Sequence, residues 1–198
     1  MKAFMLLLAV LSASIVQAQT VKKENARTAL LLIDIQEFYF SGGRLPLEGC
    51  DEAVKVASGL LHFFRQNQLP VIHVMHQGGG EIHPLVAPGK GEKVFVKKEV
   101  NAFLGTGLYD YLQQLGIRHL VLAGMQTHMC LEAAVRAASD FGFRCTVIQD
   151  ACATRTLVWE KDTVPAPMVQ TAVFATLKAY GTIMPADAFI RQFSEENK

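Results

Sequence analysis

The sequence has almost no net charge, and this balance is the first constraint on its function. Its 19 lysines and arginines are matched by 18 aspartates and glutamates, which leaves a formal net charge of +1. Both signs are scattered, and the lysine pairs at 22–23 and 97–98 are too short to form basic arms. Nucleic-acid-binding proteins concentrate positive charge on one face, so we expect no nucleic-acid partner.

A glycine-rich phosphate-binding fingerprint is also missing. No GxGxxG follows the first apolar run, and Gly78-Gly79-Gly80 opens a loop rather than a helix. A dinucleotide site is therefore not expected, and we predict that the protein uses no cofactor. The chain shows no internal repeat, low-complexity tract or second-domain boundary, so residues 19–198 suit one domain of ordinary size.

The first 18 residues are typical of a secretory signal peptide. Met1-Lys2 form a short basic start, residues 3–11 are almost wholly apolar, and Val16-Gln17-Ala18 offers small residues for cleavage after Ala18. This pattern predicts a periplasmic or secreted mature chain without a membrane partner. The apolar run is short for a membrane span, and an uncleaved N-terminal anchor is the alternative.

The four cysteines contain no CxxC pair and are irregularly spaced. An exported protein permits disulfides, but this pattern does not require them. Cys145 and Cys152 flank one predicted strand, and at roughly 3.3 Å per residue they stand too far apart for a bridge. We predict that Cys130 is free and leave the pairing of the other cysteines open.

Apolar runs of strand length alternate with helical patterns through the rest of the chain. The expected strands are 28–33, 71–76, 93–97, 119–124, 143–149 and 181–184, and the expected helices are 51–66, 108–115, 127–141, 168–180 and 186–193. This alternation predicts an α/β fold with three layers, α/β/α, around a mostly parallel, Rossmann-like sheet of about six strands.

The stretch from Leu120 to Ala137 places a thiol just after the carboxyl end of a strand, which is where open α/β sheets form their active sites. A buried strand ends at Gly124, Thr127 is a candidate helix cap, and Cys130 falls in the first helical turn. The N-terminal end of a helix favours thiolate over thiol. The alternative is that Cys130 is simply a small buried helix residue, since free cysteines are often buried.

Two further reactive residues occupy equivalent positions. Asp34 follows the first strand directly, and Lys97 ends the third. Right-handed crossovers bring the carboxyl ends of parallel strands to one rim, so we expect Asp34, Lys97 and Cys130 to meet there. An ammonium would favour the thiolate, and a carboxylate would carry a proton to and from the reaction.

Four motifs then resemble those of the isochorismatase-like cysteine hydrolases, a superfamily that includes nicotinamidases and N-carbamoylsarcosine amidohydrolases. They lie in order at 31–36 (LLIDIQ), 97–106 (KKEVNAFLGT), 124–130 (GMQTHMC) with 136–138 (RAA), and 150–154 (DACAT). The resemblance covers residues 28–184, nearly the whole mature chain.

This resemblance implies a catalytic triad of Asp34, Lys97 and Cys130. Lys98 competes with Lys97, but adjacent strand residues point to opposite faces, and counting back six residues from Phe103 selects Lys97. It also implies a cis peptide at Met125–Gln126. This bond would direct the backbone N–H of Gln126, together with that of Cys130, at a developing oxyanion.

The implied reaction is acyl transfer to the Cys130 thiol, with cleavage of a small amide or related C–N bond. Tyr39, Phe103 and His76 are candidate substrate-binding residues, although His76 is as readily explained as a solvated or satisfied histidine. Nicotinamidases bind a metal through an Asp-x-His pair after the second strand. Here that strand ends Val74-Met75-His76, so we predict no metal and doubt nicotinamide as the substrate.

Two other functions remain open on the same fold. An isochorismatase-type ether hydrolase needs no thiol nucleophile, and a binding protein would have lost the chemistry altogether. Because relatives form dimers or tetramers, we also expect a homo-oligomer in which the arm at 154–167, with the only tryptophan, Trp159, packs on a neighbouring subunit. The alternative is a surface loop folded back on its own domain.

Overall fold

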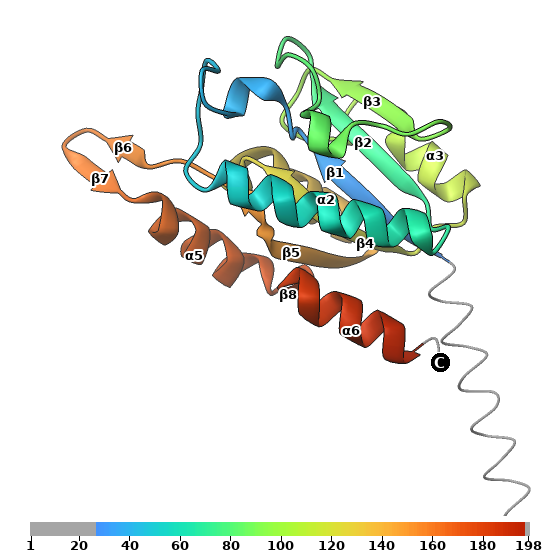
Figure 1. The fold of residues 1–198 in the computed structure, drawn as a ribbon. Coiled ribbons are helices and arrows are strands. Elements are labelled where there is room, and N and C mark those ends of the chain that lie inside the picture. Colours follow the sequence, from blue (N-terminus) through green and yellow to red (C-terminus); the bar gives the residue numbers. More distant parts are fainter. Residues whose placement is uncertain (1–26, 197–198) are drawn as a thin grey trace, which may run out of the picture.

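The protein is a three-layer α/β/α sandwich, as the sequence predicts (Figure 1). The computed structural model describes residues 27–196, so the predicted signal peptide lies outside the described residues. Six strands build the central sheet: β1 (Thr28–Ile33), β2 (Val71–His76), β3 (Lys93–Lys97), β4 (His119–Met125), β5 (Arg144–Ala153) and β8 (Thr182–Met184). All neighbouring pairs in this sheet are parallel.

The strand order β3-β2-β1-β4-β5-β8 creates a crevice beside the first strand. The chain builds outward from β1 to β3, then returns to the other side of β1 and builds outward again. The connections after β1 and β4 therefore diverge at their carboxyl ends, which is where open α/β sheets bind ligands. Residues that follow β1 and β4 consequently face each other across this crevice.

Successive side chains of a strand point to opposite faces of the sheet, and each face forms its own hydrophobic core. The helices are α2 (Cys50–Gln66), α3 (Leu108–Gln114), α4 (Glu132–Asp140), α5 (Ala166–Leu177) and α6 (Ala186–Glu196). Leu30 and Leu32 of β1 pack with α2 and α6, whereas Leu31 and Ile33 pack with α3, α4 and α5. Both faces of the sheet are thus covered, which explains why β1 is a continuous apolar run.

Element boundaries differ from the prediction chiefly at β5 and in the arm. The expected end at residue 149 is wrong, because β5 runs on to Ala153 and pairs with the end of β4. The arm contains a small antiparallel hairpin of β6 (Leu157–Trp159) and β7 (Asp162–Val164), which extends away from the body (Figure 1). None of the helices within residues 27–196 is long and apolar enough to cross a membrane.

Candidate active site

Three strand ends bring Asp34, Lys97 and Cys130 into contact at the predicted rim. The ammonium of Lys97 stands between the other two side chains. Its Nζ lies 2.8 Å from Asp34 Oδ2 as an ion pair and donates hydrogen bonds to Cys130 Sγ at 3.1 Å and to the carbonyl oxygen of Glu99 at 3.1 Å. The ammonium therefore has two hydrogen-bond acceptors and one ion-pair partner within the protein. Lys98, the competing lysine, is exposed.

Asp34 is held in a conformation that few residues adopt. It follows the last residue of β1 with φ of +49°, in the left-handed region that aspartate tolerates better than most side chains. Its side chain is fully buried. Among the described residues, the polar groups that act on this carboxylate are the Lys97 ammonium, as an ion pair, and the Cys130 thiol, and neither bond is well directed. Buried unsatisfied carboxylates are costly, so this arrangement points to a functional group.

Burial outweighs the ammonium in setting the protonation of this group. It raises the pKa of Asp34 despite the lowering effect of Lys97. It also raises the pKa of Cys130 to about 12, with a further increase from the charge of Asp34. Lys97 lowers the pKa of Cys130, as expected from the sequence, but burial and Asp34 together raise it by more. Cys130 rests as a thiol beside a carboxylate that has become a stronger base.

The last residues of β4 fix the approach to Cys130. Gly124 adopts φ of +136°, and a Cβ placed there would lie 2.0 Å from the carbonyl oxygen of Ile33. Only glycine permits this close passage of β4 against β1, at a point where the pairing of β4 with β5 shifts register. The next peptide bond, Met125–Gln126, is cis, as predicted from the sequence.

The turn that carries Cys130 is π-helical rather than α-helical. It spans Thr127–Leu131 and leads directly into α4. The N–H groups of Met129 and Leu131 both donate to the carbonyl oxygen of Gln126, at 3.0 and 3.3 Å. Thr127 does not cap the helix as expected, because its hydroxyl donates to the carbonyl oxygen of Ala153 and ties the turn to β5.

Gln126 links two further side chains that surround the site. Its side-chain Nε2 donates to the hydroxyl of Tyr39 at 3.3 Å, and its Oε1 accepts from Arg155 Nε at 3.2 Å. Tyr39 is buried, and its pKa is raised by burial and by the nearby charges of Cys130 and Asp34. Its hydroxyl therefore stays protonated, accepts from Gln126 and keeps its own hydrogen to donate.

Gln36, buried within the first motif, fastens the loop that follows β2. Its Nε2 donates to the carbonyl oxygens of His76 and Gly80, and its Oε1 accepts from the N–H of His76. The side chain of His76 bonds to the carbonyl oxygen of Gln77 and is near enough to lower the pKa of Asp34. In the sequence, Gln36 stands out only as the last residue of the LLIDIQ motif, and no separate role was predicted for it.

Phe103 lies among core residues. Its ring packs against those of Phe141 and Phe143, with centroids 5.4 and 6.3 Å apart. Its predicted role in substrate binding, like those of Tyr39 and His76, stays a prediction. Within residues 27–196, no cluster of three or more histidine, cysteine or acidic side chains could hold a metal ion, and all four cysteines are buried and unpaired.

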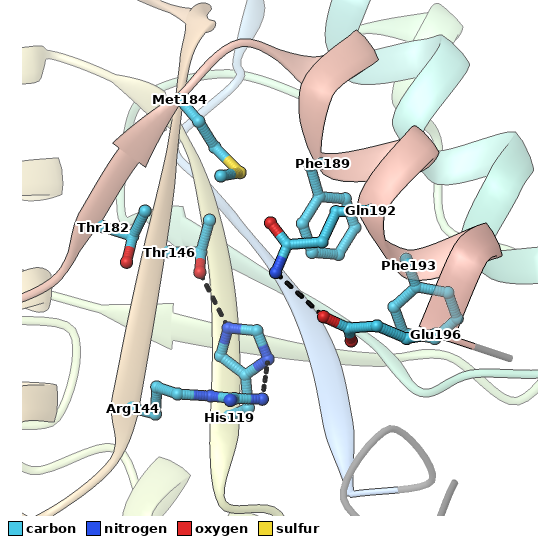
Figure 2. Close-up of a pocket in the computed structure, with 9 residues that line it drawn as sticks. All are labelled: His119, Arg144, Thr146, Thr182, Met184, Phe189, Gln192, Phe193 and Glu196. Carbon is cyan, nitrogen blue, oxygen red and sulfur yellow. Dashed lines mark hydrogen bonds between the residues drawn. The ribbon is translucent and has the colours of Figure 1, made fainter. Parts of the chain in front are cut away.

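A separate cavity of about 90 Å³ lies at the opposite, amino-terminal edge of the sheet (Figure 2). His119 forms part of its wall and bonds to Thr146 Oγ1 at 2.8 Å and to an amino group of Arg144 at 3.2 Å. Burial and the charge of Arg144 lower the pKa of His119 to about 3, so this ring is neutral and its nitrogens are engaged. No cysteine lines this cavity, and its histidine is engaged in hydrogen bonds, which makes it a poor alternative to the Cys130 site.

Comparison with known proteins places the chain among relatives of the predicted superfamily. The isochorismatase domain model matches residues 28–178. An uncharacterised isochorismatase family protein of Bacillus subtilis, YddQ, is 42% identical over 178 residues, covering 83% of this chain and 99% of that protein. A streptothricin hydrolase of Streptomyces noursei is 32% identical over 179 residues, covering 82% of this chain and 63% of that protein.

Solved structures agree with this result. An isochorismatase from Pseudomonas putida KT2440 is 34% identical, covers 83% of this chain and 91% of its own, and has a TM-score of 0.80. An N-carbamoylsarcosine amidase from Thermoplasma acidophilum shares the fold, with a TM-score of 0.68, 24% identity and coverage of 81% and 97%.

Proposed function

The chain belongs to the isochorismatase family of hydrolases, and on that premise we propose that it cleaves a small amide or related C–N bond through a thioester on Cys130. The observation that carries this proposal is the contact of Lys97 Nζ with both Asp34 Oδ2 and Cys130 Sγ, at 2.8 and 3.1 Å. A thiol, a base of raised pKa and a fixed positive charge are the groups that acyl transfer requires.

The reaction begins with transfer of the Cys130 proton to Asp34. The sulfur attacks the substrate carbonyl carbon, and the carbonyl oxygen becomes an oxyanion that accepts from the backbone N–H groups of Gln126 and Cys130. Lys97 offsets the negative charge throughout. Asp34 returns the proton to the leaving nitrogen as the C–N bond breaks, so that ammonia or an amine departs and a thioester remains.

Hydrolysis of the thioester reverses these roles. Asp34 takes a proton from water, the resulting hydroxide adds to the thioester carbonyl, and the C–S bond breaks to release a carboxylic acid. The proton then returns to the Cys130 sulfur. The raised pKa of Asp34 suits both roles, because a carboxyl group of intermediate pKa can accept a proton in one step and donate it in the next.

One observation favours an amide over an ether as the substrate. Hydrolysis of a vinyl ether needs no thiol nucleophile, yet this chain keeps Cys130 in direct contact with Lys97. The ether hydrolase and a non-catalytic binding protein remain the competing functions, and each makes a different prediction about Cys130.

Replacing the nucleophile tests the proposal directly. We expect Cys130→Ala to abolish turnover across a panel of small primary amides, measured as ammonia release, while Cys145→Ala keeps it. The control removes a thiol that is equally buried but lies outside the site. Activity that survives in Cys130→Ala would contradict the thioester route.

Intact-mass spectrometry separates the competing functions. An amide substrate, trapped by rapid acid quench, should leave an acyl adduct on Cys130. An ether hydrolase would turn over its substrate without an adduct, and a binding protein would show neither adduct nor turnover.

Export and self-association are part of the same proposal. N-terminal sequencing of the chain produced with its leader tests cleavage after Ala18. Self-association is supported by the apolar hairpin of β6 and β7, on which the side chain of Trp159 is 76% exposed.

A further inference from the structure

Three arginines gather at the amino-terminal edge of the sheet, opposite the Cys130 site. Arg27 directly precedes β1, Arg118 directly precedes β4, and Arg144 is the first residue of β5. These strands are neighbours in the sheet, and backbone hydrogen bonds join the arginines: the N–H of Arg118 donates to the carbonyl oxygen of Arg27, and the N–H of Arg144 donates to that of Arg118. Together with His119, they line a cavity of about 140 Å³. The proposed reaction uses none of these arginines.

No carboxylate between residues 27 and 196 pairs with Arg27 or Arg118. Within this described part of the chain, the side chain of Arg27 forms no hydrogen bond, and that of Arg118 donates only to neutral oxygens, at Gln113 and in the backbone. The residues that line the cavity include no acid, and Glu196 lines the adjoining cavity, where it accepts from Gln192 (Figure 2). Like charges on neighbouring strands repel, so an anion in the cavity would relieve this repulsion.

Buried polar side chains beside the cavity hold Arg144 in place. His119 Nδ1 accepts from an amino group of Arg144 at 3.2 Å, and His119 Nε2 donates to Thr146 Oγ1 at 2.8 Å (Figure 2). Because burial and Arg144 keep the ring neutral, Nδ1 stays available as an acceptor. His119 and Thr146 are only 7% and 6% exposed. Burial of polar side chains is costly without hydrogen bonds, and here those bonds fix a guanidinium that lines the cavity.

We propose that Arg27, Arg118 and Arg144 form a binding site for a phosphate-class anion of two or more negative charges, separate from the catalytic site. Guanidinium groups bind phosphate oxygens in pairs, and three of them favour a multiply charged anion. The cavity has room for a tetrahedral group, since a water molecule takes up about 30 Å³ of the liquid. Free phosphate compounds and lipid headgroups present the same charged oxygens. This site does not depend on the proposed function.

Calorimetric titration of the purified protein with pyrophosphate tests the site. We expect binding that weakens as the ionic strength rises, because salt screens the interaction of exposed charges. Arg27→Gln and Arg118→Gln should each weaken the binding about tenfold, as loss of a charge-assisted hydrogen bond implies. Arg118→Lys keeps the charge but not the paired donors, and it should weaken the binding less than Arg118→Gln.

Arg44→Gln is the matched control for these variants. Arg44 is exposed, loses the same charge when replaced, and lies between β1 and α2, beyond the carboxyl end of β1. We expect this variant to bind pyrophosphate as the unmodified protein does. Circular dichroism and the unfolding midpoint without ligand establish that each variant is folded.

Flotation with phosphatidylcholine vesicles that contain phosphatidic acid separates the two sources of the phosphate group. If the ligand is a lipid headgroup, these vesicles bind the protein, vesicles of phosphatidylcholine alone do not, and Arg27→Gln and Arg118→Gln reduce the bound fraction. If it is a free phosphate compound, pyrophosphate binding depends on the arginines and the vesicles do not bind. The inference is overturned if neither probe binds, or if both glutamine variants bind the probes within twofold of the unmodified protein.

Discussion

At the scale of single residues, burial couples the protonation of Cys130 and Asp34 to each other and to the charge of Lys97. Cys130 is a thiol because its sulfur is buried and faces Asp34, and Asp34 is a stronger base because it is buried too. Lys97 offsets both effects only in part. In the proposed reaction the thiolate is therefore formed by proton transfer within the site, and we expect slow alkylation and oxidation of the resting thiol at neutral pH.

The opposing effects of Asp34 and Lys97 on the pKa of Cys130 predict a variant whose thiol is alkylated faster but which turns over amides more slowly. Asp34→Asn removes a charge that raises the pKa of Cys130, and asparagine tolerates the same left-handed backbone. We expect iodoacetamide to modify Cys130 about tenfold faster at pH 8, because one pKa unit multiplies the thiolate fraction by that factor. Turnover of amides should be lost, since no base carries the proton.

The pH profile of alkylation provides the check. In both proteins the rate should rise with pH, but the rise should begin at lower pH in Asp34→Asn. Because the folded pKa of Cys130 exceeds its unfolded value of about 8.5, folding stability should fall as pH increases above that value. Slower alkylation in Asp34→Asn would mean that Asp34 assists thiolate formation in the resting site.

A second prediction concerns the buried ion pair. Lys97→Met leaves the Asp34 carboxylate without its counter-charge, and we expect a loss of about 3 kcal/mol or more in the free energy of unfolding by urea. Lys98→Met, at the adjacent exposed position, should change it by less than about 0.5 kcal/mol. The double variant Lys97→Met with Asp34→Asn should recover part of the loss, because the buried charge has also gone. Equal losses for both lysine variants would contradict the assignment of Lys97.

Sequence reasoning located the reactive residues but missed those that surround them. Asp34, Lys97 and Cys130 each lie directly at a strand end, and parallel strands gather their carboxyl ends. Arg155 and the side chain of Gln126 depend on β5 running four residues past its predicted end, against the polar residues Gln149 and Asp150. Gln149 and Asp150 are exposed, so β5 carries two consecutive polar side chains near its end. Two such residues after an apolar run are typical of a loop, and the sequence pattern therefore predicted that the strand ends there.

At the scale of elements, the register of β4 against β1 is what places Cys130. Gly124 lets the two backbones approach at the point where β4 turns toward the crevice. The sequence predicted that the strand ends at this glycine, whereas β4 continues one residue further, to Met125. The π-helical turn that follows could not be predicted, because it arises from tertiary contacts such as the hydrogen bond of Thr127 with Ala153.

The close approach at Gly124 predicts a large effect of one methyl group. Gly124→Ala places a Cβ against the backbone oxygen of Ile33 and requires a positive φ of alanine. We expect a loss of about 3 kcal/mol or more in the free energy of thermal or urea unfolding, together with loss of Cys130 reactivity.

Gly59→Ala is the matched control for this substitution. Gly59 lies inside α2 with open space around the added Cβ, so alanine should stabilise the protein by about 0.5–1 kcal/mol. If Gly124→Ala and Gly59→Ala changed the free energy of unfolding by similar amounts, β1 and β4 could move apart without loss of stability, and the prediction would be wrong.

At the scale of the whole molecule, the hairpin of β6 and β7 exposes large apolar side chains that no other part of the described chain covers. Val158 and Trp159 are 67% and 76% exposed, and Val164 and Met168 continue the apolar surface. The alternative of an arm folded back on its own domain does not fit this exposure. Large apolar side chains at such exposure are typical of protein interfaces, and we expect a second copy of the chain to cover them.

Sedimentation velocity of residues 19–198 tests this expectation. We expect a dimer or larger species, and a shift toward monomer when Val158 and Trp159 are both replaced by serine. Leu104→Ser removes an equally exposed apolar side chain elsewhere and should leave the distribution unchanged. A monomeric parent protein would contradict self-association through the hairpin.

The strand order has a consequence for how the chain acquires its chemistry during folding. Asp34, Lys97 and Cys130 lie 63 and 33 residues apart along the chain, and the strands that carry them, β1, β3 and β4, join one sheet only after the connections between them have closed. No local segment can assemble the triad, and contacts between distant residues form slowly because their loop entropy must be overcome first. A nascent or partly folded chain therefore carries a solvated, ordinary thiol at Cys130. The buried thiol in contact with Lys97 is a property of the completed sheet alone.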